Sequence, residues 1–185
     1  MLETLEHIDR DLFLTLNGLH SGIFDLLMPF ISGNVIWIPL YIWLIYRLYK
    51  AYPPKKFYWI LPILAVCILL TDQISVQLFK NIFLRYRPCH NEEIKSLIHL
   101  VDGCGGKYGF VSSHAANVFG IAALVSLLLK DRKITICLIF WAALVAYSRI
   151  YLGVHYPADI LVGSVLGVLV GVSTYKAFYK FATHD

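Results

Sequence analysis

Residues 134–179 read ITICLIFWAALVAYSRIY, LGVHY and PADILVGSVLGVLVGVSTYKAFY, and this stretch decides the class of fold. Two apolar segments flank a short turn, and each is close to the length of about 20 residues that a helix needs to cross a bilayer. Similar segments elsewhere predict an all-α, polytopic membrane bundle of about five spans. They lie at 23–49, 57–79, 112–129, 134–151 and 157–179. The first is interrupted by Gly33-Asn34, so it is either one tilted helix or a half-helix followed by a span.

The composition agrees with an integral membrane protein. The 185 residues are 58% hydrophobic and 15% charged, and the mean hydropathy is +0.66, whereas soluble domains have about 25% charged residues. The length suits a single domain over residues 1–185. The net charge of +4 is modest, and nothing indicates binding to nucleic acid or a particular oligomeric state.

Residues 1–20 form an acidic N-terminal segment with the single arginine Arg10. A secretory signal would begin with basic residues, so this segment is not one. Leucines recur at steps of three and four residues, or multiples of them, which predicts an amphipathic helix. Such a helix lies either on the membrane surface or across the end of the bundle as a cap.

The cations divide unequally between the two sides of the five-span arrangement. Most fall on one side, which the positive-inside rule makes cytoplasmic: Arg47, Lys50, Lys55, Lys56, Lys130, Arg132, Lys133, Lys176 and Lys180. The C-terminus is then cytoplasmic, while the loop 80–111 and the turn 148–156 face the periplasm or exterior. The cations there oppose the rule, and an anionic ligand would explain them: Lys80, Arg85, Arg87 and Arg149.

A first polar cluster lies where the second span ends. Lys80 and Arg87 share a face if the helix continues over the two turns between them. Pro88 is expected to end that helix at Arg87. An arginine fork and a lysine ammonium both bind phosphate oxygens. Basic residues that merely snorkel at the end of a span would give the same pattern.

A second cluster, Ser112-Ser113-His114, opens the third span. Serine is a preferred N-cap, and the free N–H groups of a helix start bind anions. His114 is placed to protonate a leaving oxygen. The alternative is an ordinary N-cap beside an interfacial histidine.

The third cluster joins the fourth and fifth spans and comprises Ser148-Arg149, His155 and Asp159. Pro157 suits the first turn of a helix, and Asp159 lies one turn after His155. The carboxylate is therefore placed to accept a hydrogen bond that fixes the imidazole tautomer, which makes His155 a competent nucleophile. A purely structural His–Asp pair is the alternative. All three clusters lie on the outer side, so they predict one phosphate site.

Together these clusters resemble the signature of the type 2 phosphatidic acid phosphatase family, which reads K-x6-RP, PSGH and SR-x5-H-x3-D. Lys80, Arg87 and Pro88 match its first part, and Ser148, Arg149, His155 and Asp159 match its last part. The resemblance extends over about residues 57–175. The middle part departs from the pattern, because Val111 replaces proline and Ser113 replaces glycine.

The resemblance implies a helical core like that of acid phosphatases and vanadium haloperoxidases, with no metal or cofactor. It implies that His155 is the nucleophile that forms a phosphohistidine, that Asp159 orients it, and that His114 is the general acid. The residues that would bind the phosphate are Lys80, Arg87, Arg149, Ser112 and the backbone N–H of Ser113.

The expected function is a lipid phosphatase on the outer face of a bacterial inner membrane, with a membrane lipid phosphate as substrate. An outward site favours undecaprenyl diphosphate. Lipid A is the alternative, followed by phosphatidylglycerophosphate and phosphatidate. A phosphotransferase would use the same phosphohistidine. Other classes are a non-catalytic lipid-phosphate binder or transporter and a vanadium-dependent oxidase.

Further polar residues and cysteines remain outside these clusters. Asp72 lies within the second span, and we expect it to hold that span in register with its polar neighbours Gln73, Ser75 and Gln77. Cys67 and Cys137 are expected to fill apolar space, whereas Cys89 and Cys104 would form a disulfide if the outer loop is in an oxidising compartment. Polar loop residues are candidates for selecting the head group: His90, Glu92, Glu93, Lys95, His99 and Lys107.

Overall fold

The computed structural model describes residues 2–182, and helices form nearly all of that part of the chain. The α-helices are α1 (Leu2–Gly18), α2 (Gly22–Ser32), α3 (Ile38–Ala51), α4 (Pro54–Ile74), α5 (Asn81–Phe83), α6 (Ser113–Leu129), α7 (Arg132–Tyr151) and α8 (Pro157–Ala182). A π-helical segment, Ser75–Lys80, links α4 to α5, and short 3-10 turns lie at Val35–Trp37, Pro88–His90 and Lys95–Leu97. The described residues contain no strand beyond an isolated bridge between Tyr86 and Tyr108. The predicted all-α bundle is therefore confirmed.

Three helical stretches are long and apolar enough to cross a membrane, at Pro54–Phe83, Arg132–Tyr151 and Pro157–Lys180. The first predicted span is broken into two helices, Gly22–Ser32 and Val35–Ala51, which meet at 70° and would together make a fourth span. The break falls at Gly33-Asn34, and the 70° bend rules out the alternative of one continuous tilted helix. The remaining predicted span is α6, which is apolar but has only 17 residues.

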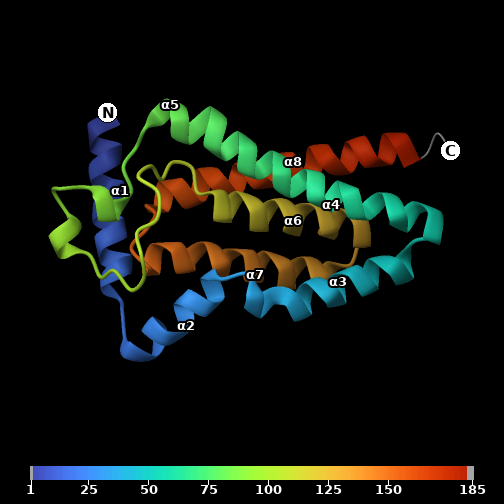
Figure 1. Cartoon of the computed structure of the whole chain (residues 1–185), viewed down its shortest axis with the longest axis horizontal. Helices are drawn as coiled ribbons and strands as arrows, with labels where there is room; N and C mark the ends of the chain where they lie inside the picture. The colour runs from blue at the N-terminus through green and yellow to red at the C-terminus, as the bar shows by residue number, and fades with distance from the viewer. Residues whose placement is uncertain (1, 183–185) are drawn as a thin grey trace.

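The outward faces of the long helices are apolar, as expected for helices in contact with lipid. Large hydrophobic side chains remain exposed along them, among them Ile68, Leu69, Phe140, Leu161 and Leu169. The helices α3, α4, α6, α7 and α8 run side by side in Figure 1, and α1 crosses one end of them. The ends of α3 and α8, the start of α4 and the α6–α7 turn gather at the opposite end, and these segments carry the cations of the predicted cytoplasmic side.

Glycines on α8 allow it to pack closely against α6. A Cβ atom on Gly163 would lie 2.7 Å from the carbonyl oxygen of Ser112. A Cβ atom on Gly167 or Gly171 would collide with the carbonyl oxygens of Ala116 and Gly120, respectively. Small residues four apart are a common device for close helix packing in membranes. Here they bring the start of α8 against the start of α6, where two of the predicted site clusters lie.

The N-terminal helix α1 caps the end of the bundle that carries the outer loop (Figure 1). Phe13 is fully buried and packs in one cluster with Ile94, Ile150 and Tyr156. The opposite face of α1 leaves apolar residues such as Leu5 and Ile8 exposed. The helix is therefore a cap on the bundle, and its contact with the membrane surface stays a prediction.

Candidate active site

The first cluster is built differently from the sequence expectation. The helix ends at Phe83, and Leu84 adopts a left-handed conformation with φ of 49°. Arg87 follows in extended backbone and precedes a 3-10 turn that begins at Pro88. The helix was expected to end at Arg87, and this prediction is wrong, because the left-handed Leu84 ends it earlier. The condition for a shared helical face of Lys80 and Arg87 is therefore not met.

Lys80 is instead held by Ser113, the serine that replaces the glycine of the family signature. Its Nζ donates a hydrogen bond to Ser113 Oγ at 2.8 Å, and Ser75 Oγ lies 2.6 Å from the same oxygen. One turn below, the side chains of Thr71 and Asn117 meet at 2.6 Å. These pairs tie the second span to α6. We expected Asp72, Gln73 and Gln77 to take part with Ser75, but among these four only the side chain of Ser75 does so.

The His155–Asp159 pair has the predicted geometry. His155 Nδ1 lies 3.2 Å from Asp159 Oδ2, and both side chains are almost wholly buried. The backbone N–H of Tyr156 donates to the same carboxylate oxygen at 3.1 Å. Pro157 is the first residue of α8, as expected. The carboxylate therefore fixes the ring so that Nδ1 carries the proton and Nε2 keeps its lone pair.

Burial lowers the pKa of His155 from 6.5 to about 4, against the opposing effect of Asp159. The nearby positive charges of Arg87 and Arg149 lower this pKa further. The imidazole is thus neutral at physiological pH, which is the state that a nitrogen nucleophile requires.

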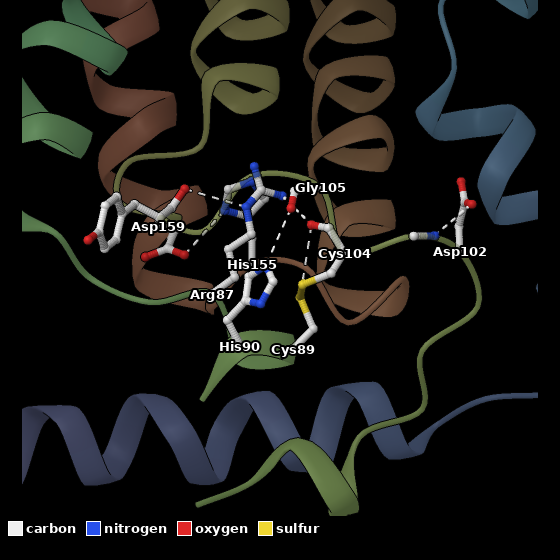
Figure 2. The surroundings of a disulfide bond; sticks show 10 residues. Arg87, Cys89, His90, Asp102, Cys104, Gly105, His155 and Asp159 are labelled. Atoms are coloured by element: carbon white, nitrogen blue, oxygen red, sulfur yellow. Dashed lines mark hydrogen bonds and ion pairs between the residues drawn. A yellow bond between two sulfur atoms is a disulfide. The ribbon is translucent and has the colours of Figure 1, made fainter. Parts of the chain in front are cut away.

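Arg87 lies between the His–Asp pair and the disulfide of the outer loop (Figure 2). Its guanidinium donates to the carbonyl oxygens of Cys104 at 3.2 Å and Tyr108 at 3.4 Å. Cys104 is bonded to Cys89, with their Cα atoms 5.9 Å apart, so the structure contains the predicted disulfide. The disulfide holds the carbonyl group that anchors Arg87.

Arg149 reaches the site from the end of α7. Its Nη1 donates to Ser32 Oγ at the end of α2, and its Nε is a buried donor with no hydrogen-bond partner within the described residues. Buried donors are normally paired, and a phosphate oxygen is an acceptor of the right kind. Lys80, Arg87 and Arg149 interact electrostatically with one another, so the three cations surround one region.

The second cluster lies at the start of α6. Ser112 is the N-cap and accepts a hydrogen bond from the backbone N–H of Ala115 at 3.4 Å, while its own N–H donates to the backbone carbonyl of Asp159. An accepting hydroxyl keeps its proton, so Ser112 remains able to donate. His114, in the first turn, is partly exposed and lies close enough to His155 for the two side chains to interact electrostatically.

Several residues of this region were not predicted from the sequence to belong to the site. Arg85 joins Asp159 to Asp9 of α1, and its only sequence signal was a cation on the outer side. Gly109 packs so closely that a Cβ atom would lie 3.0 Å from Asp159 Oδ2 and 3.1 Å from Arg87 Cγ. No sequence pattern marked Ser32 as a partner of Arg149, because the two residues lie far apart in the sequence.

This arrangement is suited to phosphoryl transfer. The oriented imidazole can act as a nucleophile, and the second histidine can act as an acid. The three cations can bind the oxygens of a tetrahedral anion. Among residues 2–182, no group of three or more His, Cys, Asp or Glu side chains is placed to hold a metal ion. The fold and site thus define a class, a helical membrane protein with a phosphoryl-transfer site.

Comparison with known proteins defines the family. Residues 59–182 match the PAP2 superfamily, and the chain belongs to it. The chain is 36% identical over 182 residues to a lipid A 4'-phosphatase of Bacteroides thetaiotaomicron, covering 97% of this chain and 81% of that one. It is 26% identical over 178 residues to undecaprenyl-diphosphatase BcrC of Bacillus subtilis, covering 95% and 84%. The crystal structure of Aquifex aeolicus LpxE superposes with a TM-score of 0.69 and 26% identity over 90% of this chain and 93% of that one.

The family assignment confirms the resemblance inferred from the motifs. The chain is an integral membrane phosphatase that acts on phosphoric esters. The preference for undecaprenyl diphosphate receives less support than the lipid A alternative, because the lipid A 4'-phosphatase is the more similar of these two relatives at similar coverage.

Proposed function

We propose that the chain hydrolyses the phosphate ester of lipid A through a phosphohistidine at His155. The observation that carries the mechanism is the buried His155–Asp159 pair, which presents a neutral imidazole near Arg87 and Arg149. A non-catalytic lipid-phosphate binder would need cations but would have no use for an oriented nucleophile.

The reaction has two steps on this geometry. Nε2 of His155 attacks phosphorus while Nδ1–H stays bonded to Asp159, and the bond from phosphorus to the lipid oxygen breaks. Protonated His114 donates its proton to that oxygen. A water molecule then attacks the phosphohistidine, neutral His114 accepts the proton of the water, and the P–N bond breaks to release phosphate. His155 returns to its neutral form.

The cations stabilise the transition state. Lys80, Arg87 and Arg149 balance the charge on the phosphoryl oxygens as the bond to the leaving lipid lengthens. The negative charge of the arriving phosphate also favours protonated His114. Ser112 Oγ and the backbone N–H of Ser113, the first residue of α6, provide further donors at a helix start.

The choice of lipid A as substrate rests on sequence similarity. A lipid A 4'-phosphatase matches nearly the whole chain at 36% identity, whereas the undecaprenyl-diphosphatase of similar coverage matches at 26%. Undecaprenyl diphosphate is the second candidate. Phosphatidylglycerophosphate and phosphatidate follow it.

We further propose that the site faces the periplasm from the inner membrane. The outer loop and α1 lie at the site end of the bundle, and the cation-rich turns lie at the opposite end (Figure 1). The positive-inside rule makes that opposite end, with the C-terminus, cytoplasmic.

The test is release of inorganic phosphate by the purified protein in detergent with EDTA. The substrates are lipid A, undecaprenyl diphosphate, phosphatidylglycerophosphate and phosphatidate. We expect the highest kcat/KM for lipid A, no loss with EDTA, and no release by His155→Ala. The exposed His7 makes no contact with the site, so His7→Ala is the matched control and should keep wild-type activity.

Each departure from this result has a distinct meaning. Highest activity on another lipid would overturn the substrate assignment alone. Release that survives in His155→Ala would overturn the phosphohistidine mechanism. Transfer of the phosphoryl group to a lipid hydroxyl rather than to water would identify a phosphotransferase.

A further inference from the structure

Arg85 lies between two buried carboxylates that come from opposite ends of the sequence. Its Nη1 donates to Asp159 Oδ1 at 2.9 Å, and its Nη2 donates to Asp9 Oδ2 at 2.7 Å. The same guanidinium lies over the ring of Tyr156, 4.2 Å from its centroid. Arg85 thus joins α1 to the start of α8, where the nucleophile is held.

The contacts of Asp159 show what this arginine contributes. Oδ2 accepts hydrogen bonds from His155 Nδ1 and from the backbone N–H of Tyr156. Oδ1 accepts only from Arg85 among the hydrogen bonds of the described chain. Asp159 is fully buried, so this cation balances a charge that water cannot reach. The planar fork of arginine also fixes the plane of a carboxylate more closely than a lysine ammonium does.

Asp9 holds the other side of the arginine. Its Oδ2 accepts from Arg85, and its Oδ1 accepts from the backbone N–H of Ala158 at 2.8 Å, in the first turn of α8. Asp9 is itself buried, and Phe13 anchors the same helix against Tyr156. The N-terminal helix therefore contacts α8 directly beside the His155–Asp159 pair.

We propose that Arg85, held by Asp9 of α1, is a positioning residue for the Asp159–His155 pair, so that α1 is part of the active site rather than only a cap. This inference rests on the proposed phosphatase mechanism. Within the described residues, the hydrogen bonds of Arg85 go to Asp159 and Asp9 and not to His155 or the phosphate-binding cations, so Arg85 acts through Asp159. Its loss would free the carboxylate to rotate and so misdirect the imidazole.

The test compares Arg85→Gln, Arg85→Lys and Asp9→Asn with Arg10→Gln as the matched control. Arg10 also joins α1 to the outer loop, through Glu93 at 2.6 Å, but does not touch Asp159. Steady-state kinetics of phosphate release in detergent would give kcat and KM, and thermal unfolding would report stability. We expect kcat of Arg85→Gln to fall by up to about 100-fold, because small misplacements of reacting groups have effects of this size.

The distribution of the effect separates positioning from a structural role. KM should change less than threefold, because Lys80, Arg87 and Arg149 are untouched. Arg85→Lys should recover part of the loss, because it keeps the charge without the fork. Asp9→Asn should lower kcat less than Arg85→Gln does, and Arg10→Gln should keep wild-type kcat.

The pH profile gives a second readout. The charged or titratable groups that face His155 are Asp159 on α8, Arg87 in the loop, Arg149 on α7 and His114 on α6. Removal of Arg85 leaves the negative charge of Asp159 without this cation, which favours the protonated form of His155. The low-pH limb of the plot of kcat against pH should therefore move to higher pH in Arg85→Gln. In Arg85→Lys this acid limb should return to its wild-type position. A residue that only holds the fold together would lower the melting temperature and leave the limb in place.

The outcomes separate the two proposals. Wild-type protein without phosphatase activity would overturn the proposed function and this inference together. Active wild-type protein with kcat of Arg85→Gln within twofold, and an unmoved acid limb, would overturn this inference alone. If Arg85→Gln does not fold, Arg85→Lys and Asp9→Asn decide, since wild-type kcat in both would contradict the inference.

Discussion

At the scale of single residues, Ser113 replaces the glycine of the family signature and adds contacts to the site. Its hydroxyl contacts both Lys80 and Ser75, which a glycine could not do. The position opens α6 in an ordinary helical conformation, so glycine's freedom is not needed there. The substitution therefore holds a cation at the site while the helix start keeps its N–H groups.

Replacing Ser113 should loosen Lys80. We expect Ser113→Gly and Ser113→Ala to raise the inhibition constant for inorganic phosphate by roughly 10-fold, since hydrogen bonds to charged groups contribute about 1.5–3 kcal/mol. Ser126 lies on the same helix, and its buried hydroxyl has no hydrogen-bond partner among the residues that the structure describes. Ser126→Ala is therefore the matched control, and an equal effect in both serines would contradict this role.

The charge state of His155 is a second residue-scale prediction. Burial lowers its pKa to about 4, so in protein labelled with ¹⁵N-histidine its NMR signals should stay those of the neutral Nδ1–H tautomer down to about pH 5. The unfolded chain binds this proton near pH 6.5. The free energy of unfolding should therefore fall as pH drops from about 6.5 towards 4. Assignment uses His155→Gln, and a titration near pH 6.5 in the folded protein would contradict the buried, neutral state.

At the scale of elements, the contact between α6 and α8 sets the distance between the two histidines of the site. Gly167→Ala would place a Cβ atom against the carbonyl oxygen of Ala116, and backbone atoms cannot move aside without separating the helices. Overpacking of this kind destabilises by about 1–3 kcal/mol. We expect a lower melting temperature and lower kcat.

A helical glycine with open space provides the control for this prediction. A Cβ atom on Gly22, the first residue of α2, would meet nothing within 4 Å. Gly22→Ala should therefore be neutral. Equal melting temperatures for Gly167→Ala and the wild type would show that α6 and α8 are not in close contact.

The outer loop depends on its disulfide. Denatured, unreduced protein should expose only the thiols of Cys67 and Cys137, and reduction should add those of Cys89 and Cys104. The Cys89→Ser/Cys104→Ser variant should be less stable by about 3 kcal/mol for a loop of this size. It should also have a higher KM, because Arg87 loses a fixed carbonyl partner. Cys137→Ser is the control, and an unchanged thiol count on reduction would show that the bond is absent.

The sequence predicted the helical elements well and their junctions less well. Apolar segments located α4, α6, α7 and α8, and motif spacing located His155 and Asp159 because both lie within one local turn. The early end of the helix at Leu84 had no Pro or Gly signal, since a leucine takes the left-handed conformation there. The Arg85 bridges and the Arg149–Ser32 contact join residues more than 70 positions apart, which no local pattern encodes.

At the scale of the whole molecule, the bundle places its charged turns and its site at opposite ends. With a membrane-impermeant thiol reagent, Gly106→Cys in the outer loop should be labelled in intact spheroplasts. Lys133→Cys at the start of α7 should be labelled only after lysis. The reverse pattern would place the site on the cytoplasmic side and contradict the proposed orientation.

The measurement that tests the central claim most directly is detection of the phosphoenzyme. p-Nitrophenyl phosphate has a leaving group that needs no proton, so His114→Ala should still form the phosphohistidine but lack the base that hydrolyses it. We predict a burst of about one nitrophenol per protein, with acid-labile phosphate on the peptide that contains His155. His155→Ala should give neither the burst nor the label. A burst with phosphate on another residue, or steady turnover in His155→Ala, would contradict the account.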